Sequence, residues 1–155
     1  MYNTAVRILK DSFEAEDIMQ EAFLTVFTKM EMYKGEVTFG AWLKRIVINK
    51  SLTQLKKNNR YNEVKMEVIP SDEVEEETID YSGVKANKIL DCLQSLKDNY
   101  RVVLNLHLIE GYDYEEIAQI LEYTNENVRT TVSRAKKKLK QVILAEQIQV
   151  QAYGR

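Results

Sequence analysis

The sequence predicts an all-α protein in which two small helical domains are joined by a flexible acidic linker. The 155-residue chain contains one proline and five glycines, the residues that most often interrupt helices. Apolar residues recur at helical steps of three and four on both sides of residues 61–83. That central segment has no helical period and contains eight acidic residues, a composition typical of a flexible linker.

We therefore divide the chain into four parts. Residues 1–60 form the first helical domain, and residues 61–83 form the linker. Residues 84–142 form a second domain of four helices that ends in a helix-turn-helix. Residues 143–155 form a C-terminal tail that extends the last helix and either frays, packs on the second domain or contacts a partner.

Three helices are expected in residues 1–60. The first is short, amphipathic and begins at Tyr2. Asp11 and Glu14 cap the second, whose apolar face contains Ala15, Ile18, Met19, Ala22, Phe23, Val26, Phe27 and Met30. Thr38 caps the third, which runs to about Asn58. Its core side is expected to contain Phe39, Trp42, Leu43 and Ile46, so we predict that the Trp42 ring is buried.

The second and third helices also carry polar faces. On the second helix, one strip consists of Asp17, Gln20, Glu21 and Leu24, and periodicity alone favours a simple solvated surface there. Between Val37 and Asn62 the chain has six cations and no acid. The third helix there presents Lys44, Arg45, Asn49, Lys50 and Thr53. Cations mixed with amides and hydroxyls suit a single-stranded or distorted nucleic acid.

The stretch from Gly111 to Lys140 predicts a helix-turn-helix. Asp113 and Glu116 have capping-box spacing, and Thr124 is suited to cap the second helix. One side of that helix is apolar, with Val128, Val132, Ala135 and Leu139. Its other sides carry Glu126, Asn127, Arg129, Thr130, Ser133, Arg134, Lys136, Lys137 and Lys138.

Those outward residues suit DNA in two ways. Glu126, Asn127, Thr130 and Ser133 are candidates for contacts to base edges in the major groove. Arg134 and the three lysines that follow it are candidates for phosphate contacts. A helical hairpin with a solvated basic face is the alternative that this stretch alone leaves open.

Composition narrows the class of protein further. The net charge of −2 conceals two basic regions, and local charge decides where nucleic acid binds. The single cysteine, Cys92, excludes a disulfide framework and fits a cytoplasmic protein. Both Cys92 and the single histidine, His107, lie on apolar stripes, so packed side chains are expected. The sequence predicts no metal, no cofactor and no membrane insertion.

Four motifs in order resemble the sigma-70 family of RNA polymerase sigma factors, specifically the small extracytoplasmic-function (ECF) group. Ala15 to Leu24 resembles the family's AxDxxQExF helix. Phe39 to Leu43, with Ile46 and Asn49, resembles its FxxWLxxIxxN segment. The entry to its second domain resembles three segments here: Leu96 to Arg101, Gly111-Tyr112 and Tyr114 to Ala118. Val128 to Thr130 and Arg134 to Leu139 resemble its recognition helix and basic tail.

The resemblance implies a function and partners. It assigns Asp17, Gln20, Glu21 and Leu24 to binding of core RNA polymerase. The loop from Lys34 to Phe39 and the helix after it would capture the unpaired strand of the minus-ten element. The helix-turn-helix would read the minus-thirty-five element, and the linker would pass towards the RNA exit path. An anti-sigma factor is an expected further partner.

Two departures from the family pattern bear on DNA recognition. Glu126-Asn127 stands where many members have Gly-Thr, and Thr131 stands where many have arginine. Base preference therefore does not transfer from relatives.

We compare three candidate functions with the sequence. The first is a promoter-specificity subunit without catalysis of its own. The second is a stand-alone helix-turn-helix regulator, which would need neither the strip on the second helix nor the basic third helix. The third is an enzyme acting on nucleic acid, which the sequence disfavours because no paired carboxylates, Cys/His cluster or phosphate-binding glycine loop is present in a suitable context.

Overall fold

The computed structural model describes residues 1–59 and 85–154, and all regular secondary structure within them is helical. The predicted all-α class is therefore confirmed. The predicted acidic linker lies outside the described residues. The chain divides into two compact units, Met1–Val68 and Ile69–Arg155, which are described separately.

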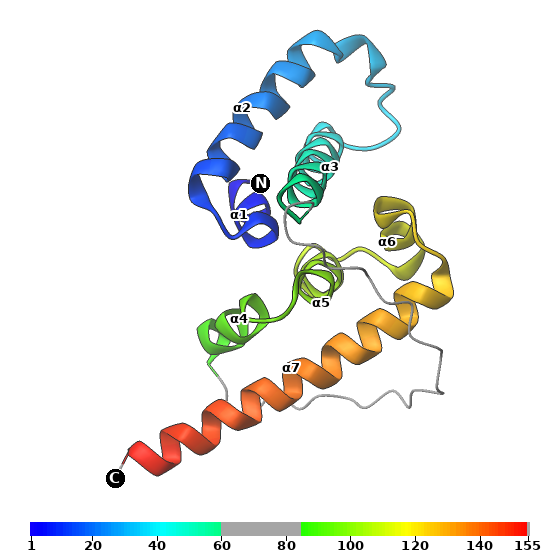
Figure 1. Cartoon of the computed structure of the whole chain (residues 1–155). Helices are drawn as coiled ribbons and strands as arrows, with labels where there is room; N and C mark the ends of the chain where they lie inside the picture. Colours follow the sequence, from blue (N-terminus) through cyan, green and yellow to red (C-terminus); the bar gives the residue numbers. More distant parts are fainter. Residues whose placement is uncertain (60–84, 155) are drawn as a thin grey trace. The chain divides into compact units, whose positions relative to one another are not determined.

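The first unit contains α1 (Tyr2–Leu9), α2 (Ser12–Thr28), the short 3-10 helix η1 (Met30–Met32) and α3 (Phe39–Asn59). The predicted N-caps are present. The Asp11 carboxylate accepts hydrogen bonds from the amides of Phe13 and Glu14, and the Thr38 hydroxyl accepts from the amide of Ala41 at 3.2 Å. The three α-helices all pack on one another, and a loop returns the chain from the far end of α2 to the start of α3 (Figure 1).

Small side chains let these helices approach closely. Ala5, Ala15 and Ala22 are fully buried, where larger residues would separate the backbones. The same buried cluster includes Leu9, Ile18, Val26, Leu43 and Val47.

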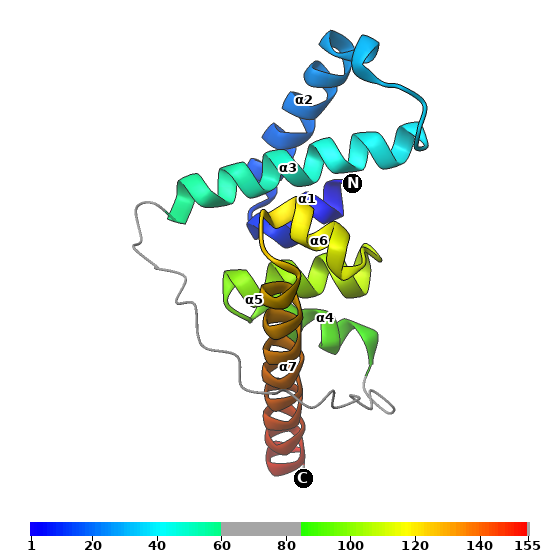
Figure 2. The ribbon, with the colours of Figure 1, turned by 90° about the vertical axis from the view of Figure 1, so that its right-hand side faces the viewer.

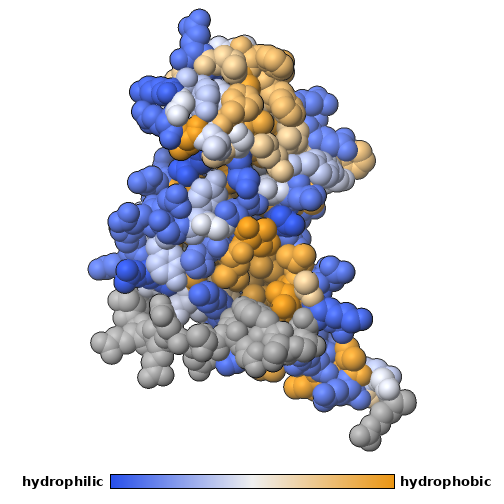
Figure 3. Space-filling model, turned by 180° about the vertical axis from the view of Figure 1, so that it is seen from behind, coloured by the Kyte–Doolittle hydropathy of each residue, from blue (hydrophilic) through white to orange (hydrophobic). Residues whose placement is uncertain are grey.

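The apolar faces expected for the second and third helices were wrong at four positions, one of which, Met30, lies in η1. Phe23, Phe27, Met30 and Phe39 are exposed, by 46%, 78%, 49% and 41%. Among the described helices, α1 and α3 pack against α2, and the C-terminal turns of α2 extend past α1 (Figures 1 and 2). Two neighbouring helices cover the narrow stripe from Ala15 to Val26, so the wider apolar face predicted from spacing remains partly in solvent. Figure 3 shows apolar residues gathered on the surface of this unit.

A polar cluster ties the start of α2 to the end of α3. The Glu14 carboxylate accepts hydrogen bonds from the Asn58 side-chain amide at 3.0 and 3.1 Å. The Gln54 amide donates to Asn58 Oδ1 at 3.0 Å. Glu14 therefore bonds to the end of α3 rather than completing a capping box with Asp11.

The second unit contains α4 (Ala86–Gln94), α5 (Asp98–Leu104), the π-helical η2 (Asn105–Ile109), α6 (Tyr114–Leu121) and α7 (Asn125–Tyr153). Because η2 continues directly from α5, the described part of this unit has four helical segments, as predicted. The helices α4, α5 and α6 all pack against α7 (Figure 1).

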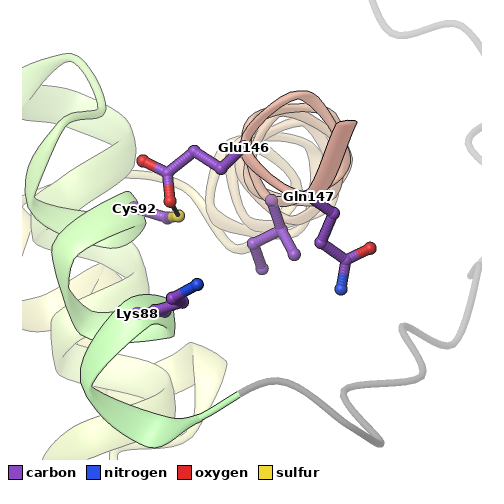
Figure 4. Close-up of a pocket in the computed structure, with 5 residues that line it drawn as sticks. Lys88, Cys92, Glu146 and Gln147 are labelled. Carbon is purple, nitrogen blue, oxygen red and sulfur yellow. Dashed lines mark hydrogen bonds between the residues drawn. The ribbon is translucent and has the colours of Figure 1, made fainter. Parts of the chain in front are cut away.

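The predicted C-terminal tail continues α7, which has 29 residues. Ile143 is buried, and the Cys92 thiol donates a hydrogen bond to Glu146 Oε2 at 3.2 Å (Figure 4). Burial and the Glu146 carboxylate raise the pKa of Cys92 to about 11, so the thiol stays protonated and unreactive at neutral pH. The first part of the tail therefore packs on α4, whereas Ile148 and Tyr153 are exposed.

Candidate nucleic-acid and polymerase interfaces

The helix-turn-helix is fixed by its caps. Asp113 and Glu116 form a complete capping box at the start of α6. Glu122 ends α6 in the left-handed region at φ 57°, which turns the chain sharply before the next helix. Thr124 then accepts a hydrogen bond from the amide of Asn127 at 3.1 Å. The capping box of Asp113 and Glu116 and the N-cap Thr124 were predicted from local spacing, whereas the left-handed C-cap at Glu122 was not.

The buried stripe of α7 is the predicted one: Val128, Val132, Ala135 and Leu139 are at most 1% exposed. At about 100° per residue, the opposite stripe consists of Glu126, Thr130, Ser133 and Lys137. Arg129 and Lys136 lie on one flank of that stripe, and Asn127, Arg134 and Lys138 lie on the other.

The outward faces of α7 differ in charge along the helix. Glu126 is in the first turn, where the helix dipole favours an acid. From there to Lys140 the sequence contains no other acid. Short polar side chains therefore lie near the helix start, and cations are concentrated further along, as expected for base contacts followed by phosphate contacts.

The predicted basic face of α3 is divided. Trp42, Arg45, Asn49 and Thr53 recur at helical spacing on one side, and Asn49 and Thr53 are exposed. Lys44 lies about 140° around the helix from Asn49, so these two side chains do not share a face. Lys50 lies 4.0 Å from Glu21 Oε2 of α2, a surface ion pair that contributes little stability.

An aromatic cluster covers the start of α3. Tyr33, Phe39 and Trp42 have ring centroids 5.2 to 5.8 Å apart. The Tyr33 hydroxyl donates to the carbonyl oxygen of Val37 at 2.6 Å, which shapes the loop between them. Trp42 is partly buried, and Phe39 is 41% exposed, so aromatic surface reaches solvent beside the cations of α3.

The strip predicted on α2 faces solvent: Asp17, Gln20, Glu21 and Leu24 are all exposed. Phe13 and Phe27, exposed by 80% and 78%, lie on the same strip by helical spacing. Neither side chain was predicted to lie on this strip. The steps 13, 17, 20, 24 and 27 were visible as a helical series, but Phe27 also fitted the apolar stripe.

The described residues contain no group of three or more His, Cys, Asp or Glu side chains able to hold a metal ion. His107 is packed as predicted: its Nδ1 lies 2.9 Å from the carbonyl oxygen of Tyr112, and its ring lies 5.0 Å from that of Tyr114. Of the described helices, none combines the length and apolar character needed to cross a membrane.

The second unit holds a helix-turn-helix with cations on the outer faces of α7. The first unit holds the basic helix α3 beside exposed aromatic rings, and an exposed strip on α2. This combination is typical of DNA-binding proteins. Comparison with known proteins identifies the family. Residues 1–61 match sigma-70 region 2, and residues 86–139 match sigma-70 region 4. The chain belongs to the sigma-70 family, in its ECF group.

Curated relatives support this assignment. The chain is 30% identical over 147 residues to the ECF RNA polymerase sigma factor SigE of Mycolicibacterium smegmatis, a match that covers 90% of this chain and 56% of that protein. It is 28% identical over 151 residues to the ECF RNA polymerase sigma factor SigW of Bacillus subtilis, covering 90% and 81%. The chain thus spans little more than half the length of the first relative and most of the second.

Solved structures support the fold. The sigma factor RpoE of Bartonella quintana, in complex with the anti-sigma factor NepR, aligns with a TM-score of 0.63 at 21% identity, over 92% of this chain and 88% of that one. CnrH, in complex with the cytosolic domain of CnrY, aligns with a TM-score of 0.58 at 20% identity, over 93% and 80%.

Proposed function

We infer that this chain is a promoter-specificity subunit that binds core RNA polymerase and directs transcription initiation. The observation that carries this inference is the presence of both sigma regions on one chain, each with an exposed face suited to its task. A stand-alone repressor would need the second unit only. The subunit would have no catalytic activity of its own and would act in the cytoplasm, where its polymerase works.

Asp17, Gln20, Glu21 and Leu24 would form the polymerase-docking strip on α2. Two features support this role. The strip is exposed along its whole length, and apolar Phe13 and Phe27 extend it at both ends. Exposed aromatic residues are enriched in protein interfaces, and a solvated face would gain nothing from them.

On α3, Arg45, Asn49 and Thr53 would contact the unpaired strand of the minus-ten element, with Lys44 and Lys50 adding positive charge. The adjacent Tyr33, Phe39 and Trp42 cluster supports this assignment because unpaired bases stack on aromatic rings.

In the second unit, α7 would read the minus-thirty-five element in the major groove. Glu126, Asn127, Thr130 and Ser133 would contact bases, with Arg129 beside them. Arg134, Lys136, Lys137 and Lys138 would contact phosphates. An anti-sigma factor is a proposed partner as well, because each of the two solved structures above contains a protein of this fold in complex with a second protein.

Run-off transcription across a genomic promoter library tests the proposal. Core polymerase plus this chain should initiate at a defined subset of promoters that share two conserved elements. Transcripts that do not depend on the chain would contradict it.

A further inference from the structure

Thr131 makes a contact that the roles assigned above do not use. Its hydroxyl Oγ1 lies 2.7 Å from the main-chain oxygen of Asn127 and 3.4 Å from Asn127 Oδ1. The first distance is a strong hydrogen bond, and the second is a weaker contact to the side chain. A hydroxyl has one proton, which these two acceptors of Asn127 share.

Helical threonines often donate to the main-chain oxygen four residues earlier. Thr25 does so in α2, to the oxygen of Glu21 at 2.9 Å. The Thr131 contact differs because it also reaches the side chain of that earlier residue. It therefore restrains the orientation of Asn127 as well as stabilising the helix.

The backbone of Asn127 is fixed from the other side. Its amide donates to the Thr124 hydroxyl at 3.1 Å, so Asn127 stands in the capped first turn of α7. Both Asn127 and Thr131 are partly buried. With Oδ1 turned towards Thr131, the NH2 group of Asn127 is left pointing away as a hydrogen-bond donor.

We propose that Thr131 is a positioning residue that sets base preference by holding Asn127 with its amide donor outward. This rests on the proposed function, because it requires the start of α7 to enter the major groove. A donor held in that orientation favours a base edge with an acceptor, such as guanine O6 and N7 or thymine O4.

The test is a binding-site selection with holoenzyme assembled from core polymerase and each variant. Thr131→Val keeps the shape of the side chain and removes the hydroxyl. It should reduce the preference for the acceptor-bearing base at one position by about three- to tenfold, the effect of losing one hydrogen bond. Thr131→Ser keeps the hydroxyl and should retain the parental preference.

Asn127→Ala should relax the same position, and adding Thr131→Val to it should change nothing further, because positioning requires the residue that is positioned. Thr25→Val is the matched control for loss of a helical hydroxyl and should leave base preference unchanged. Thermal unfolding of each variant separates a loss of fold from a loss of preference.

Three results would overturn the proposal: a parental motif of parental strength from Thr131→Val, a further change when it is added to Asn127→Ala, or no retention of preference by Thr131→Ser. A different result would contradict the proposed function itself. If the parental holoenzyme selected no motif at all, the function would be wrong, whereas a parental motif with an unchanged Thr131→Val motif removes only this inference.

Discussion

Asn105 is a buried amide at the first residue of the π-helical segment η2. Its side chain is 2% exposed, and within the described part of the chain neither Oδ1 nor Nδ2 has a hydrogen-bond partner. An unsatisfied buried polar group loses its hydration without compensation, which costs about 1–3 kcal/mol. This position therefore destabilises the second unit.

Replacing Asn105 with leucine should stabilise that unit by about 1 kcal/mol or more, since an apolar side chain of similar size removes the unsatisfied group. Native-state hydrogen exchange of amides in α5 and α7 measures the gain. Ser51→Ala, measured on the amides of α1 and α3 in the first unit, is the contrasting control. Buried Ser51 already donates to the oxygen of Val47 at 2.8 Å and should show no gain. Faster exchange in Asn105→Leu would contradict the assignment of this amide as unsatisfied.

Predictions at the residue scale succeeded where the signal was local. The caps at Asp11, Asp113 and Thr124 depend on residues within three positions, so spacing alone identified them. The exposure of Phe27 and Phe39 depends on which helices happen to cover α2 and α3, and that is set by tertiary packing. The contact between Thr131 and Asn127 depends on rotamers, which spacing does not specify.

At the scale of the element, α2 presents one face to the core and another to solvent. Replacing Asp17, Gln20 and Glu21 together with alanine should leave the helix folded, because alanine has the highest helix propensity. We expect binding to core polymerase to weaken by at least about tenfold, or about 1.4 kcal/mol. A fluorescence titration with purified core polymerase measures this.

Two single variants sharpen that experiment. Phe27 lies on the strip, so Phe27→Ser should also weaken binding to core polymerase. Glu16→Ala removes an exposed acid beside the strip and should have little effect on that binding. Equal losses from Glu16→Ala and from the triple variant would indicate a general charge effect, and no loss from the triple variant would exclude this docking surface.

The recognition helix α7 separates base contacts from phosphate contacts along its length. Glu126→Ala should change which bases are preferred, by about 1–3 kcal/mol at one or two positions. Lys137→Ala should weaken binding to all sequences and make its salt dependence shallower by about one unit of slope. Site selection and salt titration distinguish the two. Recovery of the parental motif with Glu126→Ala would mean that this helix is oriented differently on DNA.

At this scale, the sequence predicted the buried stripe of α7 correctly up to Leu139. For the residues after it, the sequence left several arrangements open. The buried stripe continued to Ile143 because α4 lies against the tail, and Cys92 contacts Glu146 there. A pairing between residues 54 positions apart leaves no periodic signal. The division of the basic face of α3 follows from helical spacing alone and could have been predicted from the sequence. The ion pair between Lys50 and Glu21 could not, because it depends on how α2 packs against α3.

At the scale of the whole molecule, the account requires promoter opening as well as recruitment. Removing the charges of Lys44, Arg45 and Lys50 should lower the yield of open complex on duplex promoters more than it lowers initial binding. A template that is already unpaired at the minus-ten element should restore much of the loss. Lys29→Ala, a charge change outside α3, is the control. Equal losses on duplex and unpaired templates would show that these cations act in recruitment alone.

The central claim is that this one chain confers promoter recognition on a polymerase that lacks it. The most direct test is a run-off reaction with nucleoside triphosphates in which core polymerase, the chain and one selected promoter are the only macromolecules. The account predicts a transcript from a single start site that requires the chain and disappears when Asp17, Gln20 and Glu21 are replaced by alanine. A transcript of equal amount without the chain, or with that triple variant, would contradict it.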